Sequence, residues 1–260
     1  MNYSFDPVYA RDRLVAELHH YAREQGFCRV VVGISGGKDS TVAAALCARA
    51  LGPGNVYGIM LPDGTQKDIA DSHRVCEALK IKNTVVNIGA VHEAVCKELN
   101  FADVSSSSFP IPVSEEAGIN VPPRIRMTVL RYITQALGAR LAGTGNLSEI
   151  TVGYCTKDGD TSCDFSLLGG LTSVEVVQVG LTMDELPRDL VLKTPSDGLC
   201  GMTDEEKLGV SYEDIHHYIR KDEQIDGDVA LRIKAMHDKS EHKFVKPKLL
   251  FDPCRHAWEF

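Results

Sequence analysis

The sequence predicts an α/β protein in which a parallel β-sheet carries helices on both faces. Short apolar runs rich in Val and Ile alternate with longer stretches of helical periodicity in the first part of the chain, and Gly or Pro separates them. A glycine-rich turn also joins the first of these apolar runs directly to a helical stretch. In open parallel sheets, such turns lie at the carboxyl ends of the strands, where ligands bind.

The N-terminal part supplies most of the predicted sheet. A first helix begins at Pro7, with Asp6 as its cap and proline at the first helical position, and ends before Gly26. The elements expected next are a strand at 30–34, a helix at 39–51, a strand at 56–61, a helix at 66–79, a strand at 84–88 and a helix at 91–99. Strands connected through helices in this way pair in parallel.

The rest of the chain is less regular. Residues 101–120 lack periodicity and are rich in Ser and Pro, which predicts an exposed, mobile connection. The elements expected after it are a helix at 124–138, a fourth strand at 139–142, a polar lid in the second half of 147–164, and helices at 172–179, 187–192, 212 onward and 228–236. No repeat or domain boundary is visible, so a single domain over 1–260 is expected.

Composition limits the classes of function. The chain has a net charge of −8 and no basic stripe, which argues against a nucleic-acid partner. No apolar run approaches the roughly 20 residues of a membrane span, and the first residues do not form a signal peptide. The eight cysteines include no C-x-x-C pair, so reduced thiols and a cytoplasmic protein are expected.

The segment Ser35-Gly36-Gly37-Lys38-Asp39-Ser40 carries the strongest chemical signal. Glycines before a helix let backbone N–H groups approach a phosphate, and the helix dipole favours an anion there. An acid beside such a cradle is explained by a bridging Mg²⁺. The alternative is an ordinary glycine-rich turn in which Asp39 is a first-turn helix acid.

This loop resembles the pyrophosphate loop of enzymes that cleave ATP between its α and β phosphates. The segments SGGKDS, LPDGTQKD, RIRM, GTGNLSE, GYCTKDGD, PSDGL, TDEEKLGVSYEDI and EHK together resemble the ammonia-dependent NAD⁺ synthetase family, in the family's order. The resemblance implies an adenine-nucleotide alpha-hydrolase-like fold and a homodimer. It also implies that ATP adenylates the nicotinate carboxylate of deamido-NAD⁺ and that ammonia then displaces AMP, giving NAD⁺, AMP and diphosphate.

The same resemblance implies roles for individual residues. Asp39 and Glu149 are expected catalytic residues that would ligate Mg²⁺. Lys38 is added to the expected catalytic residues on a hypothesis of our own about its charge. The expected ATP-binding residues are Gly33, Ile34, Ser35, Gly36, Gly37, Lys38, Asp39, Ser40, Gln66, Thr144, Ser173 and Ser196. The residues expected to hold deamido-NAD⁺ are Arg124, Lys157, Asp164, His242 and Lys243. Asp204, by contrast, reads as part of the acidic first turn of a helix.

Some features leave alternatives open. Ser173 stands where the family usually has a lysine that contacts ATP phosphate, and we hypothesise that Lys38 replaces that charge. The chain is also too short for the additional amidase domain, about 250 residues, of glutamine-dependent relatives, so ammonia is expected as a free substrate unless a separate subunit delivers it. The competing interpretations are another pyrophosphate-loop amidating enzyme, or a family member that binds nucleotides with weak or lost turnover.

Overall fold

The computed structural model describes residues 3–66, 68–105, 114–194, 203–221 and 225–245. Within these ranges the strands form one sheet, and every pairing in it is parallel. The order across the sheet is β3-β2-β1-β4-β5. The strands are β1 (Val30–Gly33), β2 (Val56–Met60), β3 (Lys82–Val85), β4 (Arg140–Gly143) and β5 (Phe165–Ser166). The predicted α/β fold with a parallel sheet is therefore confirmed.

The centre of the sheet is also its switch point. Val30 of β1 is in register with Val56 of β2 on one side and with Arg140 of β4 on the other. The chain runs outward from β1 to β2 and β3, and then returns to place β4 on the opposite side. The loops that follow β1 and β4 therefore leave the sheet next to each other, which is where ligands bind in this architecture.

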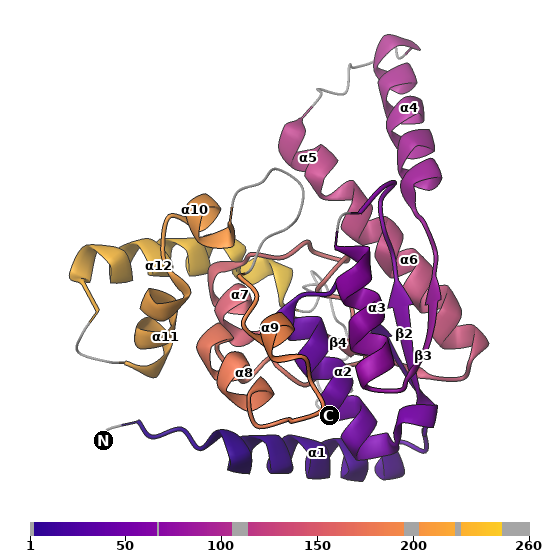
Figure 1. Cartoon of the computed structure of the whole chain (residues 1–260). Coiled ribbons are helices and arrows are strands. Elements are labelled where there is room, and N and C mark those ends of the chain that lie inside the picture. The colour runs from indigo at the N-terminus through magenta and orange to yellow at the C-terminus, as the bar shows by residue number, and fades with distance from the viewer. Residues whose placement is uncertain (1–2, 67, 106–113, 195–202, 222–224, 246–260) are drawn as a thin grey trace, which may run out of the picture.

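Helices cover both faces of the sheet (Figure 1). Val30 and Val32 face a core formed with helices from one side. Val31 faces a core formed with the helix α6 (Val121–Ala136) on the other side, as the alternation of side chains along a strand requires. The helices of the first face are α1 (Pro7–Glu24), α2 (Lys38–Leu51), α3 (Ile69–Ala78), α8 (Ser173–Gly180) and α9 (Arg188–Val191). On the second face, α6 (Val121–Ala136) packs against β1 and β4.

A smaller helical layer lies beside the sheet, and its helices after residue 203 are coloured orange to yellow in Figure 1. Its own core includes Val152, Ile215 and Ile233, all buried. The layer consists of α7 (Leu147–Val152), α10 (Asp204–Leu208), α11 (Tyr212–Arg220), α12 (Gly227–Ser240) and the 3-10 turn η2 (Glu241–Lys243). Because α7 follows the β4 loop directly and packs on α11 and α12, it connects this layer to the switch point.

Several boundaries differ from the prediction. The third strand lies at Lys82–Val85 rather than 84–88, and all four of its residues are exposed because it is the edge of the sheet. The irregular connection predicted at 101–120 was wrong in part. Helix α4 (Gly89–Ser105) extends into it, and α5 (Glu115–Ile119) forms after Ser114, whose side chain accepts a hydrogen bond from the backbone of Ala117. Residues 106–113 lie outside the described ranges.

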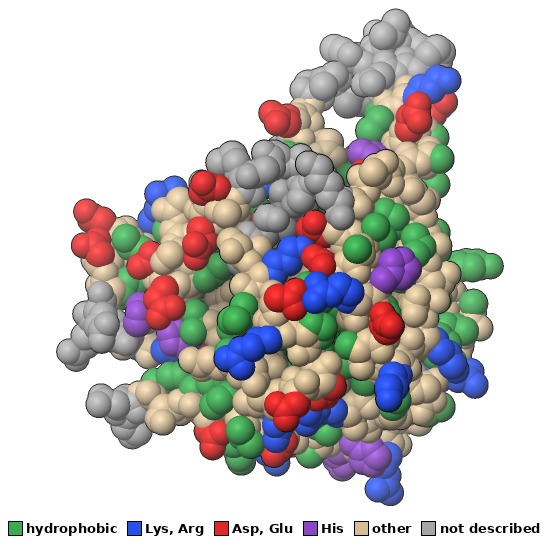
Figure 2. All heavy atoms as spheres, in the orientation of Figure 1, with side chains coloured by type: hydrophobic (Ala, Val, Ile, Leu, Met, Phe, Trp, Pro, Cys, Tyr) green, Lys and Arg blue, Asp and Glu red, His purple; other side chains and the backbone are tan. Residues whose placement is uncertain are grey.

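Further elements were not expected. The short 3-10 helix η1 (Pro53–Asn55), helix α7 and the two-residue strand β5 were absent from the prediction. None of the helices in the described ranges is long and apolar enough to cross a membrane. On the face shown in Figure 2, acidic and basic side chains are interspersed.

Candidate active site

The loop after β1 turns sharply to enter α2. Gly36 has φ +81°, a left-handed conformation that suits glycine, and its Cα lies directly against α3. Hydroxyl groups hold the turn from inside: Ser40 Oγ donates to the carbonyl oxygen of Gly37 (3.1 Å), and Thr41 Oγ1 donates to the same oxygen (2.8 Å). Gly37 is the N-cap of α2 and has no side chain to bind the first-turn N–H groups, which therefore can meet an anion.

Lys38 is buried at the start of α2, with only 3% of its surface exposed. Its Nζ donates to Asp39 Oδ2 at 2.7 Å and lies 5.2 Å from the centre of the Tyr212 ring. A buried ammonium needs such partners, because desolvation is costly for an unpaired charge. The positive charge is therefore fixed between Asp39 and the Tyr212 ring, at the start of α2.

Asn146 brings the two predicted metal ligands together. Its Nδ2 donates to Asp39 Oδ1 (3.0 Å), while its Oδ1 accepts from the backbone N–H of Glu149 (3.0 Å). Glu149 Oε2 in turn accepts from the backbone N–H of Asn146 (2.9 Å), which completes a capping box at the start of α7. The loops after β1 and β4 thus meet through one amide side chain. Asn146 was missed in the sequence, although an Asn followed three residues later by Glu is a helix-start signal.

The charges here are poorly balanced. Burial raises the pKa of Glu149 to about 8; the neighbouring Asp39 carboxylate adds to the rise and the Lys38 ammonium opposes it. A carboxyl group held near another carboxylate favours either a proton or a cation. Carboxylate oxygens are the protein ligands that Mg²⁺ prefers, so this donor set fits the expected ion. No cluster of three or more His, Cys, Asp or Glu side chains suited to a metal occurs in the described ranges, so Mg²⁺ would need water or phosphate oxygens besides these two carboxylates.

Asp204 was interpreted as a plain helix acid, and it does begin α10, but only 6% of it is exposed. The hydroxyl groups of Tyr154 and Tyr212 each donate to its carboxylate at 3.2 Å. Burial raises the pKa of Asp204, and these two hydrogen bonds and Lys38 oppose the rise. Asp204 therefore lies near Lys38 and is part of the candidate site. The sequence alone gives no signal for these contacts, because they depend on how α11 packs on α7 and brings Tyr212 and Tyr154 to Asp204.

Four of the predicted dinucleotide-binding residues lie together at a second place. Arg124 Nε donates to the carbonyl oxygen of Lys157 (3.2 Å), and Lys157 Nζ donates to the carbonyl oxygen of His242 (3.0 Å). Lys243 Nζ donates to the carbonyl oxygens of Gly153 and Cys155, at 2.8 and 2.9 Å, and so holds the turn after α7. The structure thus gathers three cationic side chains from α6, the polar segment and η2.

The other predicted residues have separate environments. Asp164 accepts from the backbone N–H of Leu141 at 2.7 Å and pairs with Arg131, so it ties the polar segment to β4. Gln66 reaches the glycine loop, with Nε2 3.4 Å from the carbonyl oxygen of Ser35. Thr144 follows β4 directly.

Ser173 is buried at the start of α8, where its backbone N–H donates to Ser148 Oγ (3.0 Å). Ser196 lies outside the described residues.

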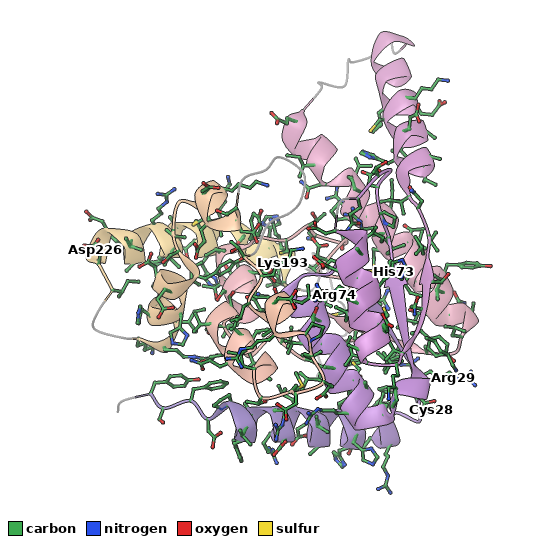
Figure 3. All side chains as sticks on the ribbon, in the orientation of Figure 1. Cys28, Arg29, His73, Arg74, Lys193 and Asp226 are labelled. Atoms are coloured by element: carbon green, nitrogen blue, oxygen red, sulfur yellow. The ribbon has the colours of Figure 1, made fainter. Side chains whose placement is uncertain are left out.

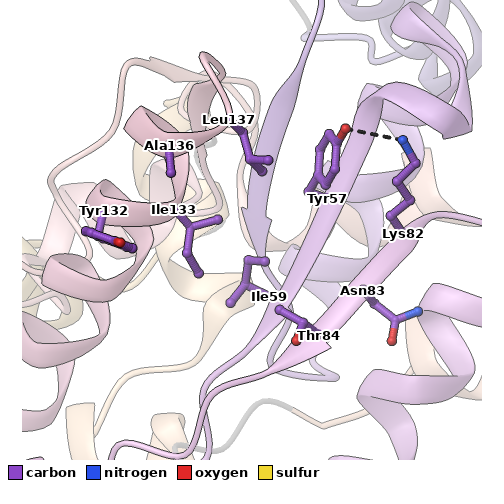
Figure 4. Close-up of a pocket in the computed structure, with 9 residues that line it drawn as sticks. All are labelled: Tyr57, Ile59, Lys82, Asn83, Thr84, Tyr132, Ile133, Ala136 and Leu137. Atoms are coloured by element: carbon purple, nitrogen blue, oxygen red, sulfur yellow. Dashed lines mark hydrogen bonds between the residues drawn. The ribbon is translucent and has the colours of Figure 1, made fainter.

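A pocket of about 290 Å³ lies on another part of the molecule, between α6 and the β2–β3 edge (Figure 4). Its lining is mostly apolar and includes Tyr57, Ile59, Ile133 and Leu137. None of the predicted site residues contributes to it. The candidate site is therefore the junction of the β1 and β4 loops, which is defined by its polar groups.

The chain is similar to known proteins over most of its length. A family model described as NAD synthase matches residues 10–247. The NH(3)-dependent NAD(+) synthetase of Carboxydothermus hydrogenoformans is 36% identical over 234 residues, which covers 89% of this chain and 93% of that protein. The enzyme of the same name from Archaeoglobus fulgidus is 33% identical over 243 residues, covering 91% and 94%. Among solved structures, NMN synthetase from Francisella tularensis has a TM-score of 0.84 at 30% identity, covering 96% of this chain and 99% of that one.

Proposed function

The chain belongs to the NAD synthase family, and from this premise we propose that it is an amide-forming ligase that uses ATP and ammonia. The proposed substrate is deamido-NAD⁺, whose nicotinate carboxylate becomes the carboxamide of NAD⁺. Relatives named NH(3)-dependent NAD(+) synthetase, at 36% and 33% identity over about nine-tenths of the chain, support this assignment. The proposal includes a homodimer, which the resemblance implies, and a cytoplasmic location, which the cysteine content of the sequence favours.

The observation that carries the proposal is the pairing of Asp39 and Glu149 through Asn146 beside the glycine loop. We assign the ATP phosphates to the N–H groups of this loop and of the first turn of α2. Asp39 and Glu149 would hold Mg²⁺, which supplies charge neutralisation where the carboxylate approaches the α-phosphate. Lys38, buried at the start of α2 and paired with Asp39, adds positive potential there.

The proposed reaction has two steps. An oxygen of the nicotinate carboxylate attacks the α-phosphorus, the bond to the bridging oxygen breaks, and diphosphate leaves. Ammonia then attacks the carbonyl carbon of the adenylate, loses a proton, and expels AMP. Arg124, Lys157 and His242 lie together where they would bind and orient the anionic substrate, since charge-assisted hydrogen bonds suit a phosphate-bearing ligand.

Nicotinate mononucleotide is a second candidate substrate. It is favoured by the likeness to NMN synthetase from Francisella tularensis, which extends over almost the whole of both chains. The two substrates carry the same reacting carboxylate and differ in the AMP half of the dinucleotide. The chemistry of the candidate site serves either substrate, so the distinction depends on binding outside the reacting centre.

The decisive assay incubates the protein with ATP, Mg²⁺, ammonium and either deamido-NAD⁺ or nicotinate mononucleotide. We expect AMP with NAD⁺ in the first mixture, at a higher kcat/KM than AMP with NMN in the second; the reverse ratio would establish the mononucleotide as the substrate. Formation of ADP, or no amide product from either compound, would contradict the proposed function and favour another nucleotide-binding role. Asp39→Asn should abolish product formation, whereas Asp12→Asn, which alters an exposed acid of α1, should leave it unchanged.

A further inference from the structure

Ser72 has an unusual environment in α3. Its side chain is completely buried. Among the described residues, Ser72 Oγ is the buried side-chain polar atom that lacks a hydrogen-bond partner. Buried hydroxyl groups are nearly always paired, because an unpaired one keeps the full cost of desolvation. The Ser72 hydroxyl therefore calls for a partner that this state of the protein does not provide.

The hydroxyl faces the glycine loop. A Cβ atom on Gly36 would lie 3.1 Å from Ser72 Oγ and 3.1 Å from the Ser72 backbone nitrogen. Ser72 thus lies directly against the loop at Gly36. The peptide groups on either side of Gly36 are the nearest part of the loop that could become its partner.

The loop and the helix behind it are held to different degrees. The hydrogen bonds at Ser35 and at the Gly37 N–H are long: Gly37 N–H to Ser35 Oγ is 3.3 Å, and Gln66 Nε2 to the Ser35 carbonyl oxygen is 3.4 Å. The shorter bonds from Ser40 Oγ and Thr41 Oγ1 hold the Gly37 carbonyl oxygen, at the start of α2. Helix α3, by contrast, is tied to α9 and to the segment after it by short ionic contacts: Arg74 donates to Asp189, and Lys193 donates to Asp71, each at 2.8 Å. Figure 3 labels Arg74 and Lys193. A change in the loop on ligand binding would therefore occur against a fixed Ser72.

We propose that Ser72 is a positioning residue whose hydroxyl donates to a carbonyl oxygen of the 35–36 turn when the loop binds a nucleotide phosphate. This rests on the proposed function, which places ATP phosphates at the loop. In a trans peptide the N–H and C=O groups point in opposite directions. Turning the N–H groups of Gly36 and Gly37 toward a phosphate directs the preceding carbonyl groups toward α3, where the Ser72 hydroxyl is the available donor.

The test compares binding and stability in three proteins. Equilibrium binding of Mg²⁺ and α,β-methylene-ATP, which is not cleaved between its α and β phosphates, is measured by calorimetry for wild type, Ser72→Ala and Thr134→Val. The last is a matched control, since Thr134 carries a buried hydroxyl in α6 that donates to Leu130. We expect Ser72→Ala to bind about 5- to 10-fold more weakly, with a ligand-free melting temperature equal to or above that of wild type. Thr134→Val should keep wild-type affinity.

Each other outcome counts against the inference. Equal affinity of wild type and Ser72→Ala would overturn it, and so would weaker binding accompanied by a lower ligand-free melting temperature, because that pattern indicates an ordinary structural role. In steady state, the KM for ATP should rise with the same factor while kcat changes little. If wild type itself fails to bind the nucleotide, the proposed function falls and takes this inference with it. Binding by wild type with no effect of Ser72→Ala removes this inference alone.

Discussion

Replacing Glu175 by Ala should destabilise the protein strongly. Glu175 lies in α8 with none of its surface exposed, and Arg220 of α11 donates to both of its carboxylate oxygens. The backbone N–H of Thr172 (2.8 Å) and the hydroxyl of Tyr3 (2.5 Å) complete its hydrogen bonds. The side chain therefore joins the N-terminal segment, α8 and α11.

The magnitude follows from what Ala would leave behind. The Arg220 side chain is 19% exposed, so it would keep a largely buried charge without its partner. Breaking a buried pair in this way costs about 3–5 kcal/mol, and partial solvent access favours the lower end, about 3 kcal/mol. For a chain of this size that corresponds to a fall of about 6–12 °C in melting temperature.

Urea unfolding at pH 7 measures the effect in a double-mutant cycle of Glu175→Ala and Arg220→Met. Each single variant should lose stability, and the double variant should lose less than their sum, with a coupling of about 1–3 kcal/mol. Arg13→Ala, which breaks an exposed pair with Glu17, serves as a control that should change stability by less than about 0.5 kcal/mol. Additive losses in the cycle would refute the reasoning, since the pair would then not act as a unit.

The same pair has a pH signature. Burial acts to raise the pKa of Glu175, but the hydrogen bonds from Arg220 and Tyr3 outweigh it, so the pKa lies below its ordinary value. A carboxyl with a lowered pKa stabilises the fold at pH above its ordinary range, and that contribution is lost as the pH falls through the folded value. The difference in stability between wild type and the double variant should therefore shrink below about pH 4.5.

Three further predictions concern the candidate site. Gly36→Ala should lose about 2 kcal/mol in urea unfolding, because φ is +81° and the new Cβ would lie 3.0 Å from Asp71 Cβ; unchanged stability would contradict the observed backbone. The pKa of Glu149 is raised to about 8, so the free energy of unfolding of metal-free wild type should fall as the pH rises from about 4.5 to 8. Glu149→Gln should remove this pH dependence and be more stable than wild type at pH 8 by on the order of 2 kcal/mol. Lys38→Met keeps the buried stem without its charge and should raise the KM for ATP at least about 10-fold; an unchanged KM would show that Lys38 does not replace the lysine expected at Ser173.

Much of the central sheet could be predicted from the sequence because its signals are local. The apolar run at β1, the glycines after it and the Ala-rich start of α2 specify a strand, a turn and a helix independently of the rest of the chain. The caps of α1 and α11 are equally local, since Asp6 and Ser211 bind N–H groups two or three residues away.

The elements that were missed depend on distant contacts. Strand β5 has two residues, Phe165 and Ser166. It forms because β4 has a free edge at Ala142 and Gly143, with which these two residues pair. Strand β3 was predicted at 84–88 instead of Lys82–Val85, because all four of its residues are exposed and its first half gives no apolar signal. In the site, the burial of Asp204 depends on Tyr154 and Tyr212, which come together through the packing of α11 against α7, and no local pattern reveals this.

The single amide of Asn146 has a consequence for how this site could diverge. Its oxygen is committed to the start of α7 and its nitrogen to Asp39, so the side chain must offer an acceptor and a donor at once. Aspartate would supply the acceptor but place a third negative charge beside Asp39 and Glu149, and serine is too short to span the two loops. Positions 39, 146 and 149 are therefore expected to co-vary as one unit among homologous chains, with a change at any one of them tolerated only when the others change with it.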